Sequence, residues 1–176
     1  MNDIRLFAFE SDFVSTLRCI PMAVRFKLDR CGIKLSLRQW SRFTRDDRQE
    51  LLMRPCGGQG EVEAYRTALT SLVALRAGEV AKPLAETPCG QWEDVRQVAP
   101  VVISHARSLG VRPPRPTEWA ALSTLQRFVL IKLTRDNHDN INFVPALQEF
   151  GLAPPQASRE PRRFAREATP AVGGRP

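Results

Sequence analysis

Residues 60–77 read GEVEAYRTALTSLVALRA, and they carry the clearest structural signal in the chain. Their apolar side chains recur at steps of three and four residues, the period of one face of an α-helix: Val62, Tyr65, Leu69 and Leu72. Gly78 follows at the place where such a helix ends. The same period recurs along most of the chain, so the sequence predicts an all-α protein, a compact bundle of about seven helices.

Start and stop signals place the other helices. We expect a short helix opening at Ser11-Asp12, and longer ones over 21–31, 44–55, 92–109, 119–134 and 143–150. Pro100 is expected to break or bend the helix over 92–109. The expected N-terminal caps are Thr44, Thr117-Glu118 and Asn142. Residues 127–133 have the propensity of a strand, but their continuity with Trp119 and Leu122 favours a buried helix.

A weak internal duplication runs through this pattern. Two segments share the order of a valine, a glycine eight residues later and then a tryptophan: Val24, Gly32 and Trp40, and Val102, Gly110 and Trp119. The matches continue in register: Phe43-Thr44 with Leu122-Ser123, Arg48 with Arg127, and Leu51-Leu52 with Leu130-Ile131. The sequence thus suggests two pseudo-repeated helix–Gly–turn–Trp–helix units, with chance similarity between two helix–turn–helix segments as the alternative.

Composition is that of one globular domain with a tail. Of the 176 residues, 43% are hydrophobic and 26% are charged. Residues 153–176 hold five Pro, five Arg and two Glu, so we expect a helical domain over 1–152 and a disordered basic tail over 153–176. The chain shows neither a signal peptide at its start nor an apolar run of about 18 residues, which predicts a soluble, cytoplasmic protein.

The basic charge is a weak argument for nucleic-acid binding. The net charge is +7, of which the tail supplies +3 (five Arg less two Glu) and the other residues +4. Basic and acidic residues alternate, as in Arg45-Asp46-Asp47-Arg48, which is typical of a solvated helix face. A nucleic-acid-binding regulator is therefore the least favoured hypothesis.

Four cysteines are spread along the chain: Cys19, Cys31, Cys56 and Cys89. None of them forms the C-x2-C pair from which zinc and iron–sulfur sites usually draw two ligands. We therefore expect buried thiols packed as small hydrophobic groups, with no metal and no cofactor. A metal or cluster carrier that uses Cys19, Cys31 and Cys56 as ligands is the alternative function.

Catalytic motifs are not found, and the only histidines are His105 and His138. Cys19 is the best candidate for a reactive thiol, because it lies beside Arg18 and just before a helix start, yet it has no histidine near it in sequence. The polar loop at 136–142 lacks the glycine and the glutamate that a calcium loop requires. These observations favour a protein that is not an enzyme.

Two blocks of sequence resemble one known family. The first block comprises Phe7-Ala8-Phe9-Glu10, residues 17–22 and residues 24–35, and the second comprises residues 119–133, His138 and residues 142–151. Over about residues 7–152 they are similar to the nitrate reductase-associated proteins of cyanobacteria and other bacteria. The resemblance implies a protein that assimilatory nitrate reductase, a molybdenum–iron–sulfur enzyme, needs for assembly, cofactor insertion or stability. The Pro- and Arg-rich tail departs from the family's compact form.

Such an accessory protein binds its partner through an exposed apolar patch rimmed by polar groups. The candidate partner-binding residues are Arg18, Cys19, Pro21, Met22, Arg25, Arg127, Lys132 and His138. Arg127 and Lys132 interrupt an apolar helix, so the other interpretations are snorkelling side chains or an ion pair. Lys27 and Asp29 raise the same question on the matching helix.

Overall fold

The computed structural model describes residues 6–11, 16–85, 90–135 and 141–154. These residues form a 3₁₀ turn, η1 (Ala8–Glu10), and eight α-helices: α2 (Met22–Cys31), α3 (Leu37–Arg42), α4 (Arg45–Met53), α5 (Gln59–Ala77), α6 (Pro100–Ser108), α7 (Pro116–Ala121), α8 (Thr124–Lys132) and α9 (Phe143–Glu149). Strands β1 (Ile33–Lys34) and β2 (Lys82–Pro83) pair antiparallel. The prediction of an all-α bundle is confirmed. Within the described ranges, every helix is too short or too polar to span a bilayer.

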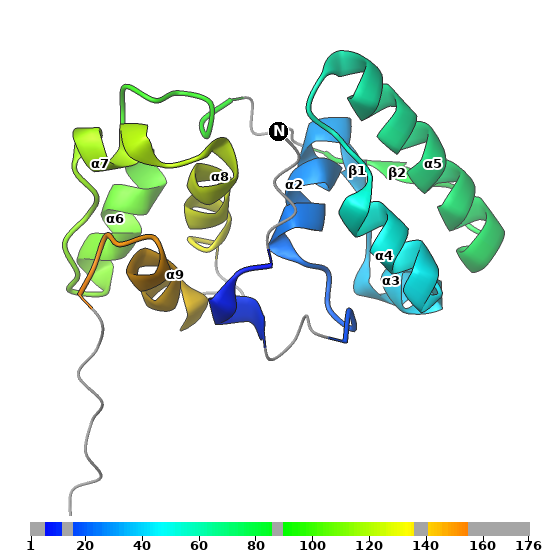
Figure 1. The fold of residues 1–176 in the computed structure, drawn as a ribbon, viewed down its shortest axis with the longest axis horizontal. Coiled ribbons are helices and arrows are strands. Elements are labelled where there is room, and N and C mark those ends of the chain that lie inside the picture. The colour runs from blue at the N-terminus through cyan, green and yellow to red at the C-terminus, as the bar shows by residue number, and fades with distance from the viewer. Residues whose placement is uncertain (1–5, 12–15, 86–89, 136–140, 155–176) are drawn as a thin grey trace, which may run out of the picture.

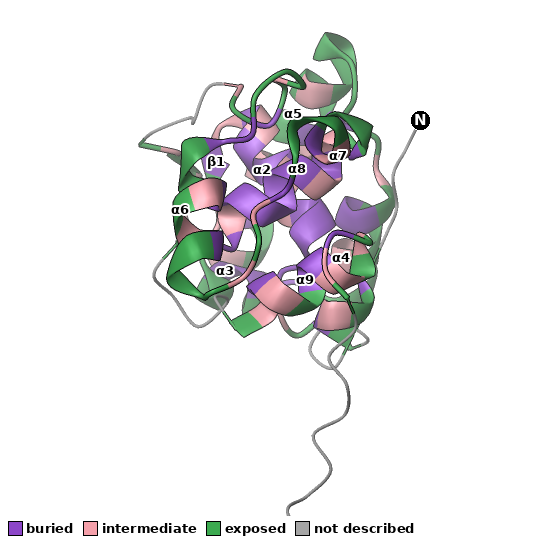
Figure 2. Ribbon diagram, turned by 90° about the vertical axis from the view of Figure 1, so that its left-hand side faces the viewer, coloured by how far each residue is buried: buried purple, intermediate pink, exposed green. Residues whose placement is uncertain are grey.

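Helices α2 and α8 lie at the centre of the molecule (Figure 1). α2 packs against α4, α5 and α8, and α8 also packs against α6 and α9. Both central helices are buried along most of their length (Figure 2). The largest fully buried side chains are aromatic: Trp40, Trp119, Tyr65, Phe7, Phe128 and Phe143. One continuous hydrophobic core therefore joins the two predicted repeats.

The two predicted repeats have matching helix boundaries. The first unit (residues 22–53) comprises α2, α3 and α4, and the second unit (residues 100–132) comprises α6, α7 and α8. α2 is followed by Gly32 at φ 66°, and the turn after α6 contains Gly110 at φ 68°. This left-handed conformation strains a side chain but not glycine, so the same residue type occurs at both turns.

The last helix of each unit has an N-cap residue whose side chain bonds to the first turn. Thr44 Oγ1 accepts a hydrogen bond from the backbone N–H of Asp47 at 3.1 Å before α4. Ser123 Oγ accepts one from the backbone N–H of Gln126 at 3.2 Å before α8. In both cases the side chain of the third helical residue accepts a hydrogen bond from the backbone N–H of the cap residue. Together the two bonds satisfy two otherwise unpaired backbone donors.

A tryptophan and an arginine fix the chain that enters each unit. The indole N–H of Trp40 donates to the Leu17 carbonyl at 2.8 Å, and Arg48 Nη1 donates to the same carbonyl at 3.1 Å. In the second unit, the corresponding Trp119 indole donates to the Asp94 carbonyl at 2.9 Å, and Arg127 Nε donates to the Trp92 carbonyl at 2.7 Å. The two units are therefore equivalent in local structure.

Several predicted boundaries are wrong. Residues 92–99 are not helical, because α6 begins at Pro100, where the missing N–H costs no hydrogen bond. The helix expected over 119–134 is two helices, since Ser123 caps α8 separately from α7. The N-cap of α7 is Arg115 rather than Thr117-Glu118. Asn142 is the N-cap residue of α9, as predicted, but its side chain makes no cap bond.

Other elements lie outside the predictions or outside the described residues. Helix α3 and the β1–β2 pair were not predicted. The short helix expected from Ser11 includes residues 12–15, which are outside the described ranges, as are residues 155–176 of the expected tail.

Candidate functional site

The eight predicted partner-binding residues are divided between the surface and the interior. Arg18 is exposed, and Cys19, Arg25 and Lys132 are half-buried. Pro21, Met22 and Arg127 are buried, so the structure assigns them to the core rather than to an exposed surface. His138 lies outside the described residues, as does Cys89.

Arg127 is a positioning residue inside the second unit. Its guanidinium donates to the carbonyls of Trp92 and Leu122 and, at 3.3 Å, to Thr124 Oγ1. Burial lowers the pKa of Arg127. The arginine holds Trp92 against α8, which explains a charged residue in an otherwise apolar helix.

Lys132 joins the two units through an ion pair. Its Nζ lies 2.7 and 2.9 Å from the two carboxylate oxygens of Asp29 on α2. The pair is largely enclosed, with 13% of the Lys132 side chain and 6% of the Asp29 side chain exposed. Burial lowers the pKa of Lys132, the Asp29 carboxylate opposes this shift, and the charges of Arg135 and Arg25 add to it. The fold therefore brings the predicted residues Arg25 and Lys132 together at the α2–α8 contact.

Lys27 holds the end of α4 from inside the first unit. Its Nζ donates to the carbonyls of Leu52 at 2.6 Å and Arg54 at 2.7 Å, which helix geometry leaves without N–H partners. Burial lowers the pKa of Lys27. A lysine at this position therefore has a structural role, which the sequence pattern alone did not separate from a functional one.

Two of the cysteines are buried, as predicted. Cys31 and Cys56 are 1% and 4% exposed, and Cys31 Sγ donates to the Leu28 carbonyl at 3.4 Å. Burial and the nearby Cys56 raise the pKa of the Cys31 thiol to about 11, and burial also raises the pKa of Cys56. Both thiols stay protonated at neutral pH, which makes them poor ligands and nucleophiles. Among the described residues, no three His, Cys, Asp or Glu side chains come together to hold a metal, so Cys19, Cys31 and Cys56 do not form a ligand set there.

Two carboxylates that the sequence analysis did not single out fix the N-terminal segment. Glu10 accepts hydrogen bonds from the backbone N–H groups of Phe7 at 3.2 Å and Met22 at 3.0 Å. Burial raises the pKa of Glu10. Glu149 on α9 accepts bonds from the N–H groups of Ala8 at 3.0 Å and Phe9 at 3.1 Å. The N-terminal segment is therefore tied to both α2 and α9.

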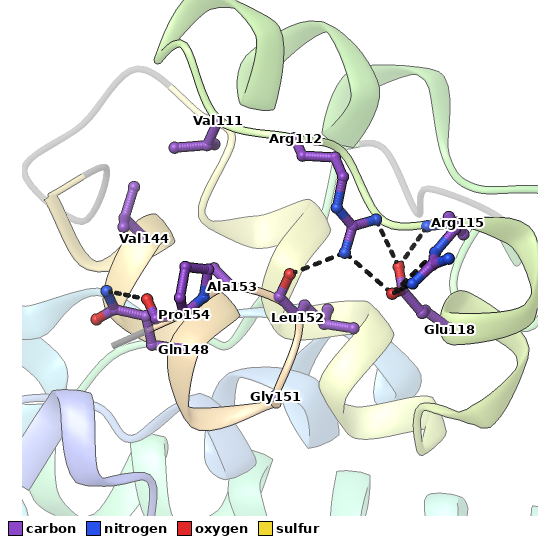
Figure 3. Close-up of a pocket in the computed structure, with 10 residues that line it drawn as sticks. All are labelled: Val111, Arg112, Arg115, Glu118, Val144, Gln148, Gly151, Leu152, Ala153 and Pro154. Carbon is purple, nitrogen blue, oxygen red and sulfur yellow. Dashed lines mark hydrogen bonds and ion pairs between the residues drawn. The ribbon is translucent and has the colours of Figure 1, made fainter. Parts of the chain in front are cut away.

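A surface groove lies between the loop after α6, the start of α7 and the end of α9 (Figure 3). It has a volume of about 610 Å³ and an apolar side and a polar side. The apolar side is formed by Val111, Val144, Ala153 and Pro154, where Gln148 donates to the Pro154 carbonyl at 3.1 Å. The polar side is formed by Arg112, Arg115 and Glu118, and Leu152 lies between the two sides (Figure 3). No sequence motif marked this groove, because its lining comes from two separate stretches of the chain, 111–118 and 144–154.

Glu118 organises the polar side of the groove. Its carboxylate accepts two hydrogen bonds from Arg112, at 2.9 and 3.0 Å, and two from the side chain of Arg115, at 3.1 and 3.0 Å. These bonds, those to Arg112 above all, lower the pKa of Glu118 to about 2. Glu118 therefore stays ionised at neutral pH, and with two guanidinium groups beside one carboxylate, this side of the groove carries an excess positive charge.

These features define a small helical protein in which buried charged side chains form hydrogen bonds with the backbone and an open groove lies on the surface. The chain matches the family model of the conserved nitrate reductase-associated protein over residues 6–150. Because the match spans most of the chain, the protein belongs to the nitrate reductase-associated family. No curated protein and no solved structure matches the chain.

Proposed function

We propose that the protein is a non-enzymatic accessory factor that binds assimilatory nitrate reductase during assembly, cofactor insertion or stabilisation of the enzyme. The observation that carries the proposal is the family match over residues 6–150. The family description names an association with the reductase and no reaction. A factor of this kind acts by forming a complex with the reductase.

The use of the buried charges supports a binding role. Glu10, Lys27 and Arg127 form hydrogen bonds with backbone groups of the protein itself. These three buried side chains therefore hold the fold and are not available as catalytic groups. The surface that we propose for the reductase includes Arg18, Cys19 and Arg25, together with His138, which follows α8 in the sequence.

The test is a pull-down of the tagged full chain from nitrate-grown cells under reducing conditions, with protein identification and metal analysis of the eluate. We expect nitrate reductase to be enriched over a tag-only bait, and the bait itself to carry no stoichiometric metal. An eluate without the reductase would contradict the proposal. A bait with stoichiometric iron or zinc would replace it with the cysteine-based carrier.

A further inference from the structure

The helix that follows each unit differs in length and in what it covers. α5 follows the first unit, has 19 residues and packs against α2, α3 and α4. α9 follows the second unit, has seven residues and packs against α8 and η1. The first unit is therefore covered along its whole length, and the second unit only in part.

The two covering helices are contacted by equivalent residues of their units. Lys27 on α2 and His105 on α6 are 78 residues apart, as are Val24 and Val102. Lys27 Nζ lies 5.7 Å from the ring centroid of Tyr65 on α5. The ring of His105 meets the ring of Phe143 on α9 edge-on, with 4.7 Å between centroids. Phe143, the first residue of α9, therefore corresponds to Tyr65 in the second turn of α5.

The chain that continues α5 also contacts α3, and the second unit has no such helix in its described part. Gln39 on α3 donates to Glu79, just after α5, at 2.8 Å, and Arg38 lies 3.4 Å from the same carboxylate. Gln39 corresponds to Glu118, since both directly precede the tryptophan of their unit. α9 ends at Glu149 and Gly151 turns the chain back, so the place beside Glu118 is left as the groove. The groove is thus the open counterpart of the site that α5 fills in the first unit.

We propose that this groove binds an amphipathic helix of a partner protein, whose apolar face contacts Val111 and Val144 and whose carboxylate pairs with Arg115. The inference rests on the proposed function, because it takes nitrate reductase as the partner. Charge complementarity favours an acidic segment, since two arginines and one glutamate line the polar side. The chain's own residues 153–176 carry five Arg and two Glu and do not complement this charge. Binding of the apolar face of an amphipathic helix in an apolar groove is a common mode of peptide recognition.

The test measures the affinity of the full chain for purified assimilatory nitrate reductase of the same organism, using Arg115→Glu and Val144→Asp as groove variants. Arg38→Glu is the matched control, because Arg38 and Arg115 are 77% and 71% exposed and each pairs with one glutamate. We expect at least a tenfold loss of affinity for each groove variant and less than a twofold change for Arg38→Glu. Circular dichroism melting of each variant shows that the fold is retained.

The outcomes separate the two proposals. If the unchanged chain does not bind the reductase, the proposed function fails and the groove inference fails with it. If the unchanged chain binds and both groove variants bind within twofold, only the groove inference is overturned. A dimer of the unchanged chain that Arg115→Glu dissociates would assign the groove to a second copy. A tenfold gain in reductase affinity on Phe164→Ala would assign it to the chain's own tail, and either result overturns the proposal.

Discussion

The two repeat units connect their helices in the same way but differ in what covers them. α2 lies inside the bundle, and its charged residues Lys27 and Asp29 have partners that compensate for their burial. On α6, the corresponding residues are His105, half-buried, and Arg107, exposed. Val101 on α6 and Leu109, directly after α6, are 43% and 46% exposed. The glycine, tryptophan and cap therefore set the local motif, whereas the covering helix decides which side chains are buried.

The largest effect is expected from the tryptophans. Trp40 and Trp119 are both 0% exposed, and each indole N–H holds the chain that enters its unit. Replacing either one with alanine leaves a large cavity, so we expect each variant to lose about 3–5 kcal/mol of unfolding free energy. Urea unfolding followed by circular dichroism measures this loss. A severe loss in one unit and a small one in the other would show that the units are not equivalent.

The next effect breaks the symmetry between α2 and α6. Asp29→Asn leaves the half-buried ammonium of Lys132 without its counter-charge, so we expect a loss of about 3 kcal/mol. Arg107→Gln, at the corresponding exposed position of α6, is expected to change the unfolding free energy by less than about 0.5 kcal/mol. Chemical denaturation of both variants checks this difference. Equal losses would mean that the different burial of α2 and α6 has no energetic consequence.

A smaller and symmetric effect is expected at the caps. Thr44→Ala and Ser123→Ala each remove a side-chain acceptor from the first turn of a helix, so each is expected to cost about 1 kcal/mol. Thermal unfolding of both variants, with Ser104→Ala on the exposed side of α6 as a control, measures the cost. If a cap variant were as stable as the control, that cap would not be one of the features that define the repeat.

The smallest effect is expected only at acidic pH, for a substitution that makes the second unit more like the first. Glu118 has a pKa of about 2 when folded and an ordinary value of 4.5, so the unfolded chain binds more protons between these values. Its stabilising contribution is present above this window and is lost as the pH falls through it. Glu118→Gln places in the second unit the glutamine that the first has at position 39. We expect this variant to lose less melting temperature than the unchanged chain between about pH 4.5 and pH 2. An equal fall in melting temperature for the variant and the unchanged chain over this pH range would contradict a stabilising role for the ion pairs of Glu118.

Much of the fold was predictable from the sequence because periodicity, caps and stop signals are local. The helix expected over 60–77 is α5 (Gln59–Ala77), and Thr44 caps α4 as expected. Six-residue α3 and α7 are too short for apolar periodicity to identify. The groove was beyond reach, because Val111, Glu118 and Val144 come together only in three dimensions. The same limit applied to Met22 and Arg127, whose burial depends on neighbouring helices.

The most direct test of the central claim is the nitrate reductase activity of a strain that lacks this protein. We expect cells with the gene deleted to lose reductase activity after transfer to nitrate, and a copy of the unchanged gene to restore it. The account also predicts that growth on ammonium stays normal, because nitrate reduction is then not needed. Full reductase activity in the deletion strain on nitrate would contradict an accessory role.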